Sequence, residues 1–383
     1  MLMQKFLIIQ TAFIGDVILA TVLIERLHAD FPDAQIDFLL RKGNEGLLQH
    51  HPYLHEVLIW NKKENKTKNL FALLKIIRKN KYDKVINVQR FFSTGLLTAF
   101  SKAKEKIGFD KNPLSFLFDI KVKHIIGTKE NPVHEVQRNL SLIKHFTSDK
   151  PANVKLYPSK DNYEKAERIV NGEWSMVNGE SSGVNRESSN VKSEKPETEN
   201  PKLKTENLQP ETGNQQPATG NYICLAPTSV WFTKQYPKEK WIEFLQQLPN
   251  EIKIFLIGAA SDKNLCDEIK NALPGKSIFN LCGELSFLES AAFMQHAKMN
   301  YANDSAPVHI ASAVNAPVTA VFCSTVTWFG YTPLSDKSFI VEKEEPLYCR
   351  PCTLHGKKYC PEKHFKCALD IKKEQLIQTL NNG

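Results

Sequence analysis

A single carboxylate, Asp16, follows the first apolar run of the chain, in the segment TAFIGDVILA. One interpretation is a helix N-terminal residue, because an acid there satisfies free amide groups and the helix dipole. The other is a general base, because a carboxylate at the carboxyl end of a strand can remove a proton from a hydroxyl in a cleft. The loop contains one glycine, Gly15, where a dinucleotide fingerprint needs three, so the segment disfavours a dehydrogenase that uses NAD or FAD.

A second polar segment, APTSVWFTKQYP, follows a predicted strand in the other half of the chain. Thr228 and Ser229 supply hydroxyls and loop amides, and Lys234 supplies a mobile positive charge. Together these groups could hold a diphosphate and stabilise it as a leaving group. The alternative is a surface lysine beside aromatic residues.

A third segment, NDSAPVHIASAVNAPVTAVF, combines a strand end, an acid, small residues and a helix start. Asp304 ends the strand, Ser305 and Ala306 offer free amides, and His309 lies one turn into the helix. A helix N-terminus of this kind binds anions. The alternative is an ordinary capped helix with a histidine in the core.

The carboxy-terminal part contains a cysteine cluster of the pattern C-x2-C-x7-C-x6-C, formed by Cys349, Cys352, Cys360 and Cys367 with His355 and His364 between them. Four thiols at such short spacing can form a structural tetrahedral zinc site. Free or reversibly oxidised thiols and disulfides are the alternatives. The other cysteines lie in apolar runs and indicate reduced core residues of a cytosolic protein: Cys224, Cys266, Cys282 and Cys323.

These segments must be positioned by alternating strands and helices. Such βαβ series predict parallel sheets covered on both faces, hence an α/β fold with two doubly wound domains and a ligand cleft at the carboxyl ends of their strands. We expect a first domain over residues 1–170 and a second over 222–383. Residues 171–221 are rich in Ser, Asn, Glu, Lys, Pro and Thr, and this composition predicts a disordered linker or insertion. The predicted strands are 6–10, 35–40, 57–60, 84–88, 106–109, 120–122, 223–227, 253–257, 277–281, 299–302 and 318–322, and the predicted helices are 17–30, 70–80, 133–146, 238–247, 263–272, 287–296 and 306–314.

Length, composition and charge agree with two globular domains. The chain has 383 residues, 42% of them hydrophobic and 24% charged, with a formal net charge of +8. Residues 1–150 contain 24 Lys and Arg against 15 Asp and Glu, so the positive charge belongs to the first half. This charge favours an anionic partner, such as a phosphorylated glycolipid, nucleic acid or membrane surface, or else marks a solvated lysine-rich face. The apolar stretch 6–24 contains Asp16, and a carboxylate in its middle argues against a membrane span. The stretch has no cleavage site, which argues against a leader peptide.

The three polar segments, in this order and spacing, resemble the ADP-heptose:lipopolysaccharide heptosyltransferases, glycosyltransferase family 9. The resemblance covers both domains and leaves out the low-complexity segment. It implies a GT-B fold, in which two Rossmann-like domains face each other across a cleft, the first domain meeting the acceptor and the second holding the nucleotide sugar. The family's common glycine after Asn-Asp-Ser is Ala306 here.

The resemblance implies an inverting transfer of a heptose or a related sugar from a nucleotide-diphosphate sugar to the lipopolysaccharide core and lipid A acceptor. Asp16 becomes the expected catalytic base and Lys234 the group that stabilises the departing diphosphate. Donor-binding residues by the same resemblance are Thr228, Ser229, Asp262, Asp304, Ser305, Ala306 and His309, and acceptor-binding residues are His134 and Arg138.

The same resemblance predicts a cytoplasmic enzyme in peripheral contact with the inner membrane, with no cofactor required for catalysis and no nucleic-acid partner. A structural zinc ion at the four clustered cysteines stays open. Two other classes remain as alternatives: a nucleotide-sugar epimerase of the same fold, and a non-catalytic protein that binds an anionic glycolipid or nucleic acid. No aromatic–basic alternation typical of a base-stacking surface is present in the sequence.

Overall fold

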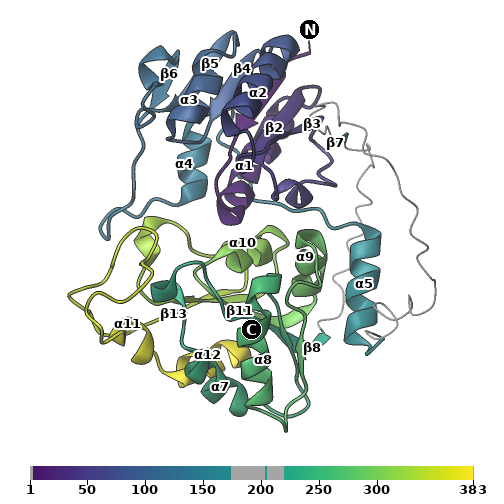
Figure 1. Ribbon diagram of the computed structural model, residues 1–383, viewed down its shortest axis with the longest axis vertical. Helices are drawn as coiled ribbons and strands as arrows, with labels where there is room; N and C mark the ends of the chain where they lie inside the picture. The colour runs from purple at the N-terminus through teal and green to yellow at the C-terminus, as the bar shows by residue number, and fades with distance from the viewer. Residues whose placement is uncertain (1–2, 174–202, 205–219, 383) are drawn as a thin grey trace.

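The computed structural model describes residues 3–173, 203–204 and 220–382, which form two α/β domains stacked on each other (Figure 1). The first domain contains β1 (Lys5–Ile9), α1 (Ile14–Asp30), β2 (Gln35–Arg41), β3 (Glu56–Trp60), α2 (Lys66–Asn80), β4 (Lys84–Asn87), α3 (Phe92–Ala99), β5 (Glu105–Phe109), β6 (Ile120–Val122), α4 (Glu135–Ser141) and the short η1 (Glu45–Leu47) and η2 (Ser115–Leu117). The second contains β8 (Gly220–Ala226), η3 (Phe232–Lys234), α7 (Lys238–Gln246), β9 (Lys253–Leu256), η4 (Ala260–Asp262), α8 (Lys263–Asn271), β10 (Ile278–Asn280), α9 (Phe287–Gln295), β11 (Ala297–Asn303), α10 (Ala306–Ala313), β12 (Val318–Phe322), η5 (Thr327–Phe329), β13 (Ser338–Glu342), α11 (Lys366–Leu369) and α12 (Lys373–Asn382).

The two sheets share one strand order. The first runs β6-β5-β4-β1-β2-β3 with the two-residue β7 (Leu203–Lys204) antiparallel at its edge, and the second runs β10-β9-β8-β11-β12-β13. Apart from β7, every pairing in the two sheets is parallel. Both orders place the first strand beside the fourth, which is the arrangement of a doubly wound Rossmann-like sheet. The expected fold class is therefore confirmed.

The sequence explains why the central strands are buried on both faces. Phe6, Leu7, Ile8 and Ile9 of β1 have no exposed surface, as expected for a strand in the middle of a parallel sheet with helices on both sides. In each sheet the strand order reverses between two neighbouring strands, which are β1 and β4 in the first sheet and β8 and β11 in the second. Doubly wound folds bind ligands beyond the carboxyl ends of the strands at this point, so the loops after β1, β8 and β11 lie in ligand-binding positions.

Helix α5 (Lys160–Val170) belongs to the second domain by its packing. It lies beside α9 (Figure 1), where the Tyr163 hydroxyl donates to Gln295 Oε1 at 2.6 Å and Lys165 pairs with Glu289 at 3.0 Å. The sequence pattern predicts no helix here and places residues 160–170 in the first domain. The predicted linker at 171–221 lies largely outside the described residues. The two elements that flank it, α5 and β8, both belong to the second domain.

The start of α4 is hydrogen-bonded to the second domain. His134 contacts the carbonyl of Thr332 through Nε2 at 3.0 Å, and Glu135 N donates to the Gly330 carbonyl at 2.8 Å. Gly330 has φ of +89°, a left-handed conformation that suits glycine. In the part of the chain that the structure describes, no helix combines the length and the apolar character that crossing a membrane requires.

Candidate active site

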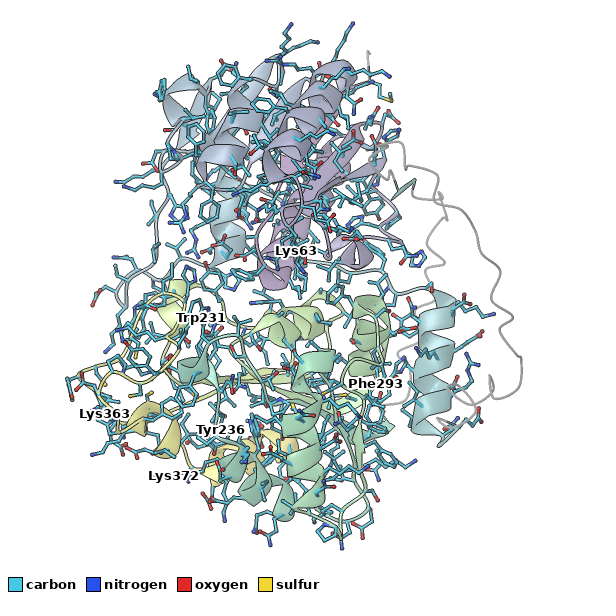
Figure 2. The ribbon with its side chains drawn as sticks, viewed as in Figure 1. Lys63, Trp231, Tyr236, Phe293, Lys363 and Lys372 are labelled. Atoms are coloured by element: carbon cyan, nitrogen blue, oxygen red, sulfur yellow. The ribbon has the colours of Figure 1, made fainter. Side chains whose placement is uncertain are left out.

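A cavity of about 320 Å³ lies between the two domains. Figure 2 places Trp231, one of its wall residues, on the side of the second domain that faces the first. The wall combines the loops after β1, β2, β8 and β11 with two later segments of the second domain. It is formed by Phe13, Ile14, Gly15, Asp16, Arg41, Ser229, Val230, Trp231, Lys234, Asp304, Ser305, Ala306, His309, Tyr331, Leu354 and His355.

Asp16 is both a helix-capping residue and a half-buried acid in the cavity wall. It occupies the first turn of α1, where its Oδ2 accepts a hydrogen bond from Phe13 N at 3.1 Å. Burial raises the pKa of Asp16 to about 6, and the negative charge of Glu135 acts in the same direction. A carboxylate with such a pKa is ionised at neutral pH yet is a stronger base than an exposed aspartate. The two interpretations of this residue are therefore compatible.

Lys234 and Asp304 form an ion pair on the opposite wall. Lys234 Nζ lies 2.7 Å from Asp304 Oδ2, with side-chain exposures of 15% and 5%. The same oxygen accepts a hydrogen bond from Thr325 Oγ1 at 2.6 Å. The pair fixes the ammonium at the edge of the cavity, where it can also contact an anionic ligand.

The start of α10 presents backbone amides to the same cavity. Ser305 is the N-cap, but its side chain makes no capping hydrogen bond and instead donates to the Asn303 carbonyl at 3.2 Å. Pro307 occupies the first turn, as it does in many helices. The amides that no side chain caps, together with the helix dipole, make this end suitable for a phosphate.

His309 and Gly15 bring α10 of the second domain and α1 of the first into contact. A Cβ atom at Gly15 would lie 2.8 Å from His309 Cδ2, so a side chain at this position would displace the imidazole. Burial lowers the pKa of His309 to about 4, and the ring is therefore neutral at physiological pH. Its Nδ1 atom has no hydrogen-bond partner among the described residues.

Two expected donor residues lie outside the cavity wall. Thr228 precedes Ser229 on the loop after β8, but only Ser229 lines the cavity. Asp262 lies after β9, where its Oδ2 accepts a hydrogen bond from Ala259 N at 2.8 Å. Their expected contacts with the donor remain predictions.

The two expected acceptor residues lie where α4 contacts the second domain. Arg138 is 3% exposed, and it donates to Glu135 Oε2 at 2.7 Å, to the Val133 carbonyl at 2.6 Å and to the Phe329 carbonyl at 2.9 Å. His134 caps α4 and contacts the Thr332 carbonyl. Neither side chain lines the cavity, and their expected role in acceptor binding remains a prediction.

The cavity also contains residues that the sequence analysis did not single out. Arg41 ends β2, and its guanidinium carbon lies 5.0 Å from the centre of the Phe13 ring. Tyr331 and His355 come from loops late in the chain. A basic residue at the carboxyl end of the strand beside β1 could have indicated Arg41, whereas no local pattern places the two loop residues here.

Two clusters contain potential metal ligands. Asp37, His55 and Glu56 offer ligand atoms within 4.8 Å of one another, but the Asp37 carboxylate already accepts hydrogen bonds from Tyr82 Oη at 2.5 Å and lies 3.0 Å from His55 Nδ1. The four clustered cysteines line a separate small cavity, whose wall also includes Thr233, the residue before Lys234. Neither group contributes to the wall of the cavity between the domains.

Comparison with known proteins identifies a family over most of the chain. The model of glycosyltransferase family 9 (heptosyltransferase) matches residues 70–364. A curated relative, lipopolysaccharide heptosyltransferase 3 of Escherichia coli K12, is 27% identical over 337 residues, which cover 83% of each chain.

Solved structures match over both domains. E. coli ADP-heptose lipopolysaccharide heptosyltransferase II superposes with a TM-score of 0.69 at 21% identity, covering 99% of this chain and 98% of that one. A family 9 glycosyltransferase from Veillonella parvula gives a TM-score of 0.74 at 16% identity, with the same coverage. The likeness establishes the GT-B fold.

The raised pKa of Asp16 predicts a specific pH dependence of stability. The folded protein holds this proton more tightly than the unfolded chain, whose aspartate has a pKa near 3.8, so stability is lost as pH rises from about 4 to about 6. We expect Asp16→Asn, which cannot ionise, to raise the free energy of unfolding at pH 7.5 by about 1–3 kcal/mol and to leave it unchanged below pH 4. Urea unfolding at both pH values measures this. Parallel stability curves for the two proteins would contradict the raised pKa.

Proposed function

The chain belongs to glycosyltransferase family 9, and from this premise we propose that it transfers a heptose, or a related sugar, from ADP-heptose to the inner core of lipopolysaccharide. The observation that carries the proposal is the shared cavity. It brings a half-buried acid of the first domain, Asp16, opposite a lysine and a free helix N-terminus of the second. An acid facing an anion-binding wall suits the transfer of a sugar from a diphosphate to a hydroxyl.

The second domain is suited to the donor. The diphosphate would contact Lys234 and the amides at Ser305 and Ala306, while Ser229 offers a hydroxyl from the neighbouring loop. Because Lys234 is already held by Asp304, its ammonium is positioned before the donor arrives. Positive charge fixed in this way stabilises the leaving diphosphate without reorganisation.

The first domain would activate the acceptor. Asp16 takes the proton of the acceptor hydroxyl as its oxygen bonds to the anomeric carbon, and the bond from that carbon to the diphosphate breaks on the other side. One displacement of this kind inverts the anomeric configuration. The negative charge moves to the departing ADP, where Lys234 and the α10 amides receive it, so this step requires no metal ion or other cofactor.

The two alternative classes are less well supported. An epimerase has no acceptor and needs acid–base groups on both sides of one sugar carbon, whereas the acids in this cavity are Asp16 and the lysine-bound Asp304. A non-catalytic binding protein does not require a carboxylate with a raised pKa in the cavity wall.

The direct test is transfer from ADP-heptose to heptose-deficient lipopolysaccharide core, followed by mass spectrometry of the product. One added heptose supports the proposal. Release of ADP with no gain in acceptor mass, or conversion of the sugar nucleotide without any acceptor, contradicts it.

Removing the base should slow transfer without weakening donor binding. We expect Asp16→Asn to lower kcat by about 10²-fold or more, the usual effect of losing a general base. In the wild type, kcat/KM should fall tenfold per pH unit below about 6, because the carboxylate becomes protonated as pH drops through its pKa. Initial rates from pH 4.5 to 8.5 measure both effects, and ADP titration serves as the binding control. Wild-type turnover in the variant would exclude Asp16 as the base.

Removing the ammonium should affect binding and rate together. We expect Lys234→Ala to weaken ADP binding by about 10–100-fold, corresponding to one charge-assisted hydrogen bond, and to lower kcat as well. Lys238→Ala is the matched control, because Lys238 lies in the same domain but pairs with Glu268 on the outer face. Isothermal titration with ADP measures the affinities. Equal effects of the two substitutions would argue against a role for Lys234 in donor binding.

An apolar and basic surface of the first domain supports peripheral contact with the inner membrane at its cytoplasmic face. Phe91, Phe116 and Ile125 are 62%, 69% and 49% exposed and lie on the loops that follow β4, β5 and β6. Exposed Arg90 and Lys123 accompany them. Aromatic side chains beside basic ones are typical of proteins that lie on anionic lipid surfaces. We name this surface the β4–β6 loop patch.

Membrane binding should depend on the aromatic residues of the β4–β6 loop patch. We expect the double variant Phe91→Ser and Phe116→Ser to bind anionic vesicles at least about tenfold more weakly, because each ring contributes apolar burial. Phe71→Ser is the control, since Phe71 is 56% exposed on α2, away from these loops. Vesicle co-sedimentation at several phosphatidylglycerol contents measures the difference. Equal binding of both variants would contradict the proposed contact.

A further inference from the structure

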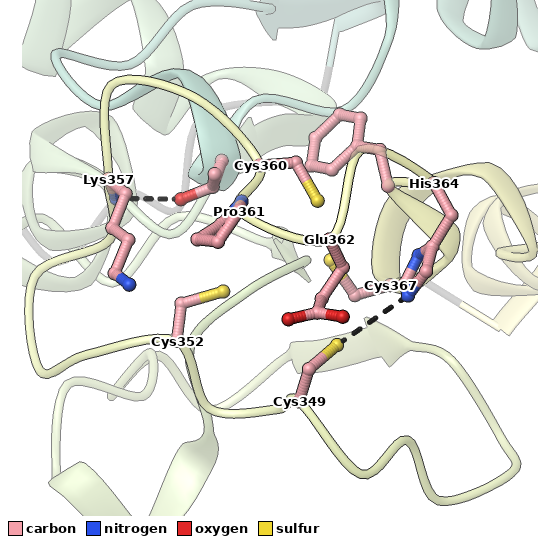
Figure 3. A pocket seen from close by; sticks show the side chains of 10 residues that line it. Cys349, Cys352, Lys357, Cys360, Pro361, Glu362, His364 and Cys367 are labelled. Carbon is pink, nitrogen blue, oxygen red and sulfur yellow. Dashed lines mark hydrogen bonds between the residues drawn. The ribbon is translucent and has the colours of Figure 1, made fainter.

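The four clustered cysteines face one small cavity in the second domain. The cavity measures about 100 Å³, and its wall includes Cys349, Cys352, Cys360 and Cys367. Figure 3 shows their side chains around a common space, with Cys349 and Cys352 on one stretch of chain, Cys360 on the next and Cys367 on α11. All four are free thiols in this structure. The fold therefore brings together ligands from segments that the sequence separates.

The cluster is open rather than closed around an ion. Among the described residues, only the group at Asp37 places three or more metal-ligand atoms within 4.8 Å of one another. The four cysteine sulfurs therefore lie farther apart than they would around a bound metal ion. A tetrahedral zinc–thiolate centre needs metal–sulfur distances of about 2.3 Å. Metal binding therefore requires the four cysteine side chains to move toward one another. His364 is adjacent, with Nε2 at 3.9 Å from Cys349 Sγ.

The loop between Cys352 and Cys360 connects this cluster to the proposed donor site. Lys357 N donates to Thr233 Oγ1 at 2.7 Å, and Thr233 N donates to the Lys357 carbonyl at 3.1 Å. Thr233 directly precedes Lys234. A Cβ atom at Gly356 would lie 2.9 Å from Lys234 Cγ, so the loop backbone packs directly on the lysine side chain.

The same loop forms part of the wall between the domains. Leu354 and His355 line the cavity that contains Asp16 and Lys234. At the base of the loop, Cys352 N donates to the Ser324 carbonyl at 3.0 Å, and Ser324 Oγ donates to Thr233 Oγ1 at 3.0 Å. Within the loop, Thr353 Oγ1 donates to the Gly356 carbonyl at 3.0 Å. An anchor at both ends would hold such a loop in place.

We propose that Cys349, Cys352, Cys360 and Cys367 bind one tetrahedral metal ion, Zn²⁺ or Fe²⁺, and that this ion holds the 353–359 loop against Lys234. Thiolate sulfurs in a four-fold set select these metals. Binding replaces the four thiol protons, which pass to solvent, and involves no change of oxidation state. The metal site stands independently of the proposed transferase activity, whereas its effect on nucleotide binding rests on that proposal.

Metal content is the first test. The full chain is purified without added chelator or metal, and elemental analysis is expected to find about one zinc or iron per chain. The double variant Cys349→Ser and Cys352→Ser, at two of the three partly buried positions, should lose it. Cys282→Ala is the matched control, because Cys282 lies beside Cys266 in the core, outside this cavity. Metal-free wild-type protein that takes up no Zn²⁺ under reducing conditions, or two disulfides in the isolated protein, would overturn the site. So would full metal content in the double variant.

The effect on the loop is the second test. After the metal is stripped from wild-type protein, hydrogen exchange in residues 353–359 should increase while the first sheet stays unchanged. ADP should bind about tenfold more weakly, as expected if the loop adopts its binding conformation only about a tenth of the time. Readdition of Zn²⁺ should restore both. A bound metal whose removal changes neither exchange nor affinity overturns the positioning role. If ADP binds no form of the protein, the proposed function fails while the metal stoichiometry still decides the site.

Discussion

The close approach of α1 and α10 is the constraint on which the cavity depends. Both helices begin at the carboxyl ends of central strands, and their first turns meet where Gly15 faces His309. A helix start cannot come this near to a buried imidazole if it carries a side chain at the contact. Because Asp16 follows Gly15 and Ser305 lies one turn before His309, this single contact sets the base opposite the anion-binding end. The neutral state of His309 also keeps an additional positive charge out of the junction.

The two acids of the cavity have different neighbours, and this difference separates their roles. Asp304 is compensated by Lys234 and by the Thr325 hydroxyl, so it serves to hold a cation. Among the described residues Asp16 has no cation paired with it, and loss of solvent together with the nearby acid Glu135 makes its ionised form costly. A carboxylate that is destabilised in this way gains from accepting a proton. The arrangement sacrifices some folding stability at the site for basicity, as functional sites often do.

Much of this architecture could be predicted from the sequence. Continuous apolar strands followed by polar loops indicated two doubly wound sheets. Residues that follow the first strand of each sheet, such as Asp16 and Lys234, line the cavity as expected. The short α3 and the edge strand β13 were missed, because eight and five residues carry little periodicity. Arg41 and His355 reach the cavity only through the tertiary arrangement of their loops. Helix α5 was missed as well, because its sequence, KDNYEKAERIV, is mostly polar and contains few residues to bury.

The docking of α5 on α9 changes what determines the distance between the two halves of the cavity. The chain leaves the first domain after α4 and is anchored on the second domain again at Lys160, before the low-complexity segment begins. The stretch 142–159 is the short covalent connection that sets the effective concentration of one half for the other. Insertions or deletions between α5 and β8 change the length of a segment whose two ends lie on the second domain, while β7 within it pairs with β3 of the first. Changes of length on either side of β7 therefore leave the short connection as it is, whereas loss of β7 removes a strand from the edge of the first sheet.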